Sequence, residues 1–171
     1  MPKNVYFKFD TVMKPDKIDI EDLIDSDLDA KDYFSSYLIN NSDSTFIIGT
    51  QDHSLIIIQE ALDENKEWTP IEHWIYSRCG NSYMEPLKLK SGKCVSIPIR
   101  KYKGDFKTKL RLKVLIRKEV FYSGLFEGSI YKSQFNKRDE KHKYPLGYNY
   151  FDYLNDKYPF HDSFLDQFFK E

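Results

Sequence analysis

The residue types that most often carry catalysis or bind metals are few in this chain and lie scattered along it. There are four histidines and two cysteines, and no two of them have the CxxC or HxxxH spacing of a metal site. Cys79 lies six residues after His73, so this pair could supply a nucleophile and a base. No orienting third group or oxyanion hole can be identified beside them. We therefore expect a chain that is not an enzyme and needs no cofactor or metal, with an unrecognised active site near His73 and Cys79 as an alternative.

A second chemical feature is positive charge, concentrated between Arg100 and Lys118. This stretch holds nine basic residues and one acid, Asp105. Basic and apolar residues alternate, and successive side chains of a strand point to opposite faces. The pattern predicts a strand whose core face carries Phe106, Thr108, Leu110, Leu112, Val114 and Ile116. The opposite face carries Arg117 and the four residues that we call the basic ladder, Lys107, Lys109, Arg111 and Lys113.

The basic ladder fits three interpretations. Same-face side chains of a strand lie about 6.7 Å apart, which resembles the spacing of phosphates along one nucleic-acid strand. However, the ladder face has no aromatic residues in its own sequence on which bases could stack. A solvated or internally paired face, with an acid such as Glu119 or Glu127 across the sheet, is the simplest interpretation. A protein partner is the next, and a nucleic-acid-associated module using residues 100–118 is the alternative.

An acidic segment, residues 16–32, provides the opposite charge with eight acids and two lysines. The spacing of Ile20, Leu23, Ile24 and Leu28 predicts a short amphipathic helix, with an irregular or extended loop as the competing interpretation. Asp25, Asp27 and Asp29 match the first three ligand positions of an EF-hand loop. The glycine and the final glutamate of that loop are replaced by Ala30 and Ser36. We expect no calcium site, and we treat the three aspartates as candidate partner contacts.

The elements that must position these charges are short strands. Glycines, Asp63–Glu67 and other polar turns separate runs rich in branched and aromatic residues. The expected strands span residues 33–39, 45–48, 55–59, 71–77, 87–89, 93–99, the basic ladder, 120–126 and 129–135. This spacing predicts a mainly β protein, an antiparallel immunoglobulin-like β-sandwich of about seven strands. Pro98 suggests that its strand lies at a sheet edge or contains a bulge. At least one of Trp68 and Trp74 is expected to pack in the core rather than form a carbohydrate or peptide platform.

The last part of the chain is rich in aromatic residues. We expect residues 1–143 to form the sandwich domain, and residues 144–171 to form an aromatic extension that ends in a helix. The extension fits either a cover for an open face of the sandwich or an arm that binds a partner. Three of its tyrosines, Tyr148, Tyr150 and Tyr153, are candidate partner contacts.

Composition limits what the whole chain can bind. The formal net charge of the 171 residues is −1, so the protein as a whole does not attract nucleic acid or an anionic membrane. We find no secretory signal and no apolar run that could span a membrane, and we expect a cytoplasmic protein whose two cysteines are free thiols. The sequence therefore predicts a non-enzymatic protein that binds another macromolecule, such as an inhibitor or immunity-type protein that blocks a cognate protein. It does not predict the oligomeric state.

Overall fold

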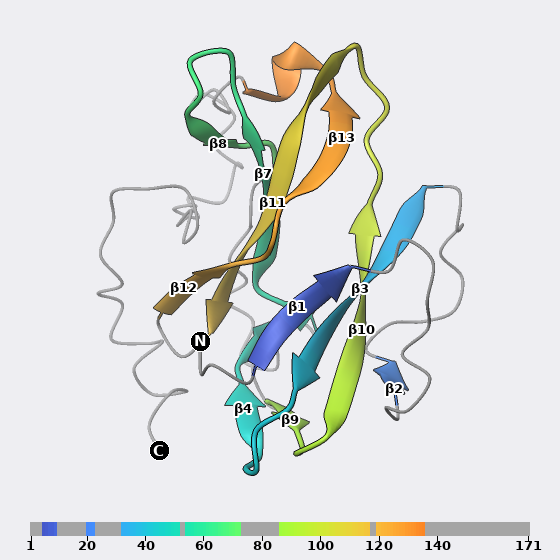
Figure 1. Cartoon of the computed structure of the whole chain (residues 1–171), viewed down its shortest axis with the longest axis vertical. Helices are drawn as coiled ribbons and strands as arrows, with labels where there is room; N and C mark the ends of the chain where they lie inside the picture. The colour runs from blue at the N-terminus through green and yellow to red at the C-terminus, as the bar shows by residue number, and fades with distance from the viewer. Residues whose placement is uncertain are drawn as a thin grey trace, which may run out of the picture.

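The computed structural model describes six stretches of the chain, and all structural statements below refer to them. They are residues 5–9, 20–22, 32–51, 54–72, 86–116 and 119–135. Within them the chain is mainly β, with largely antiparallel sheets and no α-helix (Figure 1). The expected class is therefore confirmed. The expected helical tail, residues 144–171, lies outside the described residues.

The first of the two larger sheets has four strands in the order β1-β3-β10-β2. β1 (Val5–Phe9) and β10 (Lys93–Arg100) both run antiparallel to β3 (Tyr33–Asn40). β2 (Ile20–Asp22) pairs in parallel with β10 over Cys94 to Ser96. Pro98 thus lies where β10 has no described strand on its second side, as expected for a residue that cannot donate a backbone hydrogen bond.

The second sheet is built around β11 (Phe106–Ile116), the longest described strand. On one side β11 pairs with β7 (Ile57–Leu62), which in turn pairs with β8 (Trp68–Pro70). On the other side it pairs first with β13 (Phe126–Ile130) and then with β12 (Glu119–Tyr122). Figure 1 shows β11 at the centre of this sheet, alongside β7, β12 and β13.

Two small ribbons and one helical turn complete the described elements. β4 (Phe46–Ile48) pairs with β9 (Leu87–Leu89), and β5 (Thr50–Gln51) pairs with β6 (Ser54–Leu55). A 3-10 turn, η2 (Lys132–Phe135), follows β13 in a region where the sequence predicts strand.

A β-bulge separates β12 from β13. Lys113 faces Tyr122 and Leu110 faces Phe126, so three residues on the edge oppose two on β11. Ser123 satisfies the local backbone: its N–H donates to the Leu112 carbonyl at 3.0 Å, and its hydroxyl accepts the Leu112 N–H at 2.8 Å. The single strand expected over residues 120–126 therefore ends at Tyr122, and three bulge residues lie between it and Phe126, the first residue of β13.

The two larger sheets share one apolar core. Its buried residues come from β1, β3 and β10 on one side, from β11 on the other, and from the ribbon β4–β9. They include Val5, Leu38, Ile48, Leu89, Val95, Ile97, Ile99, Leu112, Val114 and Ile116. Burying a side chain of this size stabilises the fold by roughly 1.5–3 kcal/mol. The core face predicted for β11 is confirmed, with Phe106 and Thr108 half-buried and the other four residues buried.

Each sheet is also buried on part of its outer face. Ile56, Ile58 and Leu115 form one outer cluster, and Tyr37, Ile39 and Cys94 form another. The outer face of β11 is therefore apolar near the end of the strand, which the alternating pattern of the basic ladder did not indicate.

Two further expectations need correction. The helix predicted from Ile20, Leu23, Ile24 and Leu28 is wrong at Ile20–Asp22, which form β2; residues 23–31 lie outside the described ranges. The described residues also contain thirteen strands rather than about seven, because predicted runs are divided and short ribbons are added.

Gly104 allows the loop before β11 to pass against the end of β13. A Cβ atom at this position would collide with the backbone of Ile130 and Tyr131, which cannot move aside as a side chain can. We predict that Gly104→Ala lowers the free energy of unfolding by about 1–3 kcal/mol, the usual range for overpacking.

Gly124 in the bulge is the matched control, because a Cβ atom added there would have nothing within 4 Å of it. Gly124→Ala should change the free energy by less than about 0.5 kcal/mol. Urea unfolding followed by circular dichroism measures both. Equal losses for the two variants would contradict the close approach at Gly104.

Candidate functional site

The basic ladder changes from exposed to buried along β11. Lys107 and Lys109 are exposed, Arg111 is half-buried, and Lys113 is buried. The face interpreted as solvated or internally paired is therefore solvated at Lys107 and Lys109 and internally paired at Arg111 and Lys113. The apolar outer cluster beside Leu115 accounts for the difference, because it occupies the same face as Lys113.

Glu60 on β7 supplies the counter-charge for the buried half of the ladder. It lies directly across from Arg111 in the register of the two strands. Its Oε2 is 2.7 Å from Nε and 2.6 Å from a terminal nitrogen of Arg111, and its Oε1 is 3.1 Å from Nζ of Lys113. The Glu60 side chain is 3% exposed and that of Lys113 is 4% exposed. A buried carboxylate thus joins two neighbouring cations of the ladder.

In the described part of the acidic segment, Asp32 contacts the basic stretch twice, and its carbonyl accepts the Lys101 backbone N–H at 2.7 Å. The carboxylate of Asp32, the last residue of the segment, lies 3.1 Å from Nζ of Lys103, and both side chains are substantially exposed. Such a surface ion pair is worth about 0–1 kcal/mol. Asp25, Asp27 and Asp29 lie outside the described residues.

Two aromatic rings enclose the guanidinium of Arg111. Its Cζ lies 3.8 Å from the ring centroid of Tyr122 on β12 and 4.3 Å from that of Trp68 on β8. We call Trp68, Arg111 and Tyr122 the aromatic clamp. Tyr122 is 47% exposed, so the clamp reaches the surface. The sequence suggested core packing for at least one tryptophan; Trp68 instead packs on a cation, and Trp74 lies outside the described residues.

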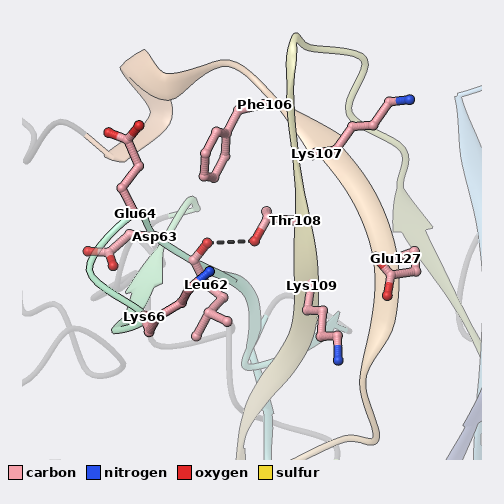
Figure 2. A pocket seen from close by; sticks show the side chains of 9 residues that line it. All are labelled: Leu62, Asp63, Glu64, Lys66, Phe106, Lys107, Thr108, Lys109 and Glu127. Carbon is pink, nitrogen blue, oxygen red and sulfur yellow. Dashed lines mark hydrogen bonds between the residues drawn. The ribbon is translucent and has the colours of Figure 1, made fainter.

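An open hollow of about 590 Å³ adjoins the first half of the ladder (Figure 2). Its walls come from the turn after β7, from the start of β11 and from β13. It is lined by Leu62, Asp63, Glu64, Lys66, Phe106, Lys107, Thr108, Lys109 and Glu127. The Thr108 hydroxyl donates a hydrogen bond of 2.5 Å to the Leu62 carbonyl and ties two walls together. The hollow therefore combines a partly apolar lining with charged groups of both signs.

A polar network lies behind this face, where β8 ends. Glu72 accepts hydrogen bonds from the Gln59 backbone N–H at 2.7 Å, from the Gln59 side-chain amide at 2.9 Å and from the Tyr102 hydroxyl at 2.7 Å. The Gln59 amide also donates to the Arg100 carbonyl at 3.0 Å. Burial, followed by the nearby negative charge and hydrogen bond of Glu72, raises the pKa of Tyr102. The network links β7 to the end of β10, and we assign it a structural role.

The described residues offer little for catalysis. They contain no group of three or more side chains that could hold a metal ion. Cys94 is a free thiol, as expected, but burial raises its pKa and therefore disfavours the reactive thiolate. Cys79 and His73 lie outside the described residues, as do the tyrosines Tyr148, Tyr150 and Tyr153.

The structure brings Arg111 together with Glu60 and Tyr122, which the sequence did not single out. It also brings Arg111 together with Trp68, which the sequence suggested only as a core residue or part of a ligand platform. Each meets Arg111 across strand pairs, so only the register of β7, β8 and β12 could have identified them. Of the two acids that the sequence suggests as cross-strand partners, Glu127 lies opposite Lys109 in register, and Glu119 lies opposite Ile116.

Comparisons with known proteins give no family for this chain. No protein-family model, curated protein or solved structure matches it. In the described stretches, no helix has the length and apolar character needed to cross a membrane. The site must therefore be interpreted from its own chemistry.

Removing the Glu60 charge should leave two cations with no carboxylate between them. We predict that Glu60→Gln lowers the free energy of unfolding by about 3–5 kcal/mol, as expected when one partner of a buried ion pair is removed. Glu67→Gln, an exposed substitution in the neighbouring turn, should change it by less than about 0.5 kcal/mol. Chemical denaturation of both variants is the measurement, and a Glu60→Gln protein as stable as wild type would contradict the assignment.

The raised pKa of Tyr102 predicts a loss of stability at alkaline pH. The unfolded chain ionises this tyrosine near pH 10, whereas the folded protein holds it neutral to higher pH. Its stabilising effect is complete below about pH 10 and declines above that by at most about 1.4 kcal/mol per pH unit. The difference in unfolding free energy between wild type and Tyr102→Phe should therefore shrink from pH 9 to pH 11. A constant difference would contradict the prediction, and Glu72→Gln should weaken the effect.

Proposed function

We propose that this protein is a non-enzymatic module that binds another protein through the aromatic clamp and the surface beside it. The observation that supports this proposal is the Arg111 guanidinium held between the Trp68 and Tyr122 rings. Tryptophan, tyrosine and arginine are the residues most enriched among those that dominate binding energy at protein interfaces. Here the three meet at one position that is partly open to solvent.

The clamp is already ordered before a partner arrives. Glu60 binds the guanidinium of Arg111, and the rings of Trp68 and Tyr122 both lie against it. Ordering a rotamer-rich side chain at an interface costs about 0.5–1.5 kcal/mol. Because Arg111 already has these contacts in the folded chain, less ordering free energy is lost on binding than for a surface arginine without them. The clamp can therefore contribute more to affinity.

The charge distribution favours protein over nucleic acid. Glu60 neutralises part of the ladder at Arg111 and Lys113, and Glu127 lies across from Lys109. A row of cations interrupted by carboxylates suits a protein surface with charges of both signs better than a continuous phosphate backbone. The nucleic-acid alternative depends on Lys107 and Lys109, which are exposed.

Within this proposal, an inhibitor or immunity-type protein acting in the cytoplasm is the most concrete version. Its support is the segregation of acidic and basic stretches along the sequence, which speeds association with a charged partner. We also infer an immunoglobulin-like sandwich. The core shared by the two larger sheets supports that inference.

Affinity capture from native lysate tests the proposal. Wild type should retain a stoichiometric protein partner, and Trp68→Ala and Tyr122→Ala should each weaken its binding by roughly tenfold or more. Tyr131→Ala, at a tyrosine that is 58% exposed and lies outside the clamp, should bind as wild type does.

Tyr122→Phe keeps the ring over Arg111 and should bind nearly normally, which separates loss of the clamp from loss of the hydroxyl. Captured proteins and nucleic acids are identified by mass spectrometry and sequencing. Capture of nucleic acid alone, or of a protein that all four variants retain equally, would contradict the proposal.

A further inference from the structure

The hollow beside the clamp has charges that the fold itself does not use. Two of its lining residues, Lys109 and Lys107, lie on the same strand as Arg111, two and four residues before it. Figure 2 shows Lys109 from β11 and Glu127 from β13 on one side of the hollow, with the turn of Asp63, Glu64 and Lys66 on the other. A partner that contacts the clamp would therefore find the hollow next to it.

Two of the three acids that line the hollow already have partners. The Asp63 carboxylate accepts the backbone N–H groups of Asn65 at 2.8 Å and Glu67 at 2.9 Å, and so closes its own turn. The Glu64 carboxylate lies 2.6 Å from Nζ of Lys132 on η2. Glu64 is therefore neutralised by Lys132, whereas Asp63 is held in its turn by neutral donors and keeps its negative charge.

The three lysines have no such partners. Among the described residues, Lys66, Lys107 and Lys109 make no side-chain hydrogen bond or ion pair, and all three are exposed. Glu127 is the one acid of the hollow without a partner in the same stretches of chain. With the Glu64–Lys132 pair set aside, these three ammonium groups face the carboxylates of Asp63 and Glu127, which leaves a local excess of one positive charge.

The residues around these lysines favour a peptide over a nucleic acid as the ligand of the hollow. Phe106 is the aromatic residue of the hollow, but its ring is already occupied by Nζ of Lys132 at 5.4 Å and by the Phe135 ring at 5.7 Å. It is therefore a poor platform for stacking a base. Lys107 and Lys109 lie about 6.7 Å apart along the strand, which is also the spacing of alternate side chains on an extended peptide.

We propose that the hollow binds an extended acidic segment of a protein partner, with glutamate or aspartate at alternate positions facing Lys107 and Lys109 and a further carboxylate near Lys66. This inference rests on the proposed protein-binding function and specifies the chemistry of the partner. Lysine ammonium groups bind carboxylates as point charges, so the site selects charge and spacing rather than one peptide sequence. Glu127 weakens the attraction and limits how many carboxylates enter.

A titration of isotope-labelled protein tests the proposal. The probe is an acetylated peptide of four Glu–Thr repeats, and the control peptide has four Gln–Thr repeats. In ¹⁵N–¹H correlation spectra the glutamate peptide should shift the amide signals of residues 62–66, 106–109 and 127, and the glutamine peptide should not. Binding should weaken as salt is raised, because the contacts are exposed ion pairs.

Charge variants decide whether the lysines carry the binding. Lys107→Glu combined with Lys109→Glu should weaken the peptide by about tenfold, since two attractive contacts become repulsive. Lys88→Glu combined with Lys90→Glu makes the same change at two exposed lysines with the same spacing on and beside β9, and should leave affinity unchanged. Glu127→Gln should increase affinity about twofold to fivefold.

Several results would overturn the inference. Absence of shifts at millimolar peptide, shifts confined to other residues, or equal losses for the two lysine pairs would each do so. So would tighter binding of an eight-nucleotide thymidine strand with the same lysine dependence, which would assign the hollow to nucleic acid. Because the peptide titration does not involve Trp68 or Tyr122, its failure alongside clamp-dependent capture of a partner would reject this inference alone.

Discussion

The carboxylate of Glu60 is the constraint on which the second sheet depends. β11 is an inner strand with neighbours on both sides, and it carries cations on a face that is partly apolar. Removing a cation from water is costly unless an opposite charge replaces the lost hydration. Glu60 meets that need because the pairing of β7 with β11 places it across from Arg111. The register of β7 and β11 thus sets the position of this carboxylate, and the carboxylate orients the Arg111 guanidinium on which Trp68 and Tyr122 stack.

This arrangement divides one run of basic residues into two physical classes. Arg111 and Lys113 form ion pairs with Glu60 within the sheet, whereas Lys107 and Lys109 are exposed to water. Because interactions between exposed charges are screened by salt and buried ones much less so, the two classes respond differently to ionic strength. Counting the cations of the stretch would overstate what it offers to a partner, since part of the charge is already used.

Much of the fold could be predicted from local patterns. Alternation in residues 106–116 and the branched and aromatic runs that became β3 and β10 identified strands and the core face of β11. Periodicity reports which face a side chain occupies, but it does not report which strand lies beside it. The Glu60–Arg111 contact joins residues 51 positions apart, so it depends on long-range pairing.

The same limit explains the errors. The apolar spacing around Ile20 fits a helix locally, but the backbone groups on one side of β10 can pair with Ile20–Asp22 as a strand, and that pairing prevails. The sequence left open whether Lys113 is solvated or paired, because alternation does not show that an apolar outer cluster and Glu60 lie beside it. The alternating sequence indicated which residues share the ladder face, but it could not indicate that Glu60, Trp68 and Tyr122 would contact Arg111.

The bulge between β12 and β13 has a consequence for the edge of this sheet. Residues of a regular strand share a face only when their numbers differ by an even count, yet Tyr122 and Glu127 differ by five. The one-residue insertion reverses the parity of the strand, so Tyr122 lies across from Lys113 and Glu127 across from Lys109 on the ladder side. The same reversal lets both Phe121 and Phe126 pack against the core shared by the two sheets. Because of the one inserted residue, Tyr122 and Glu127 lie on the same face of the sheet, while Phe121 and Phe126 both stay packed against the core.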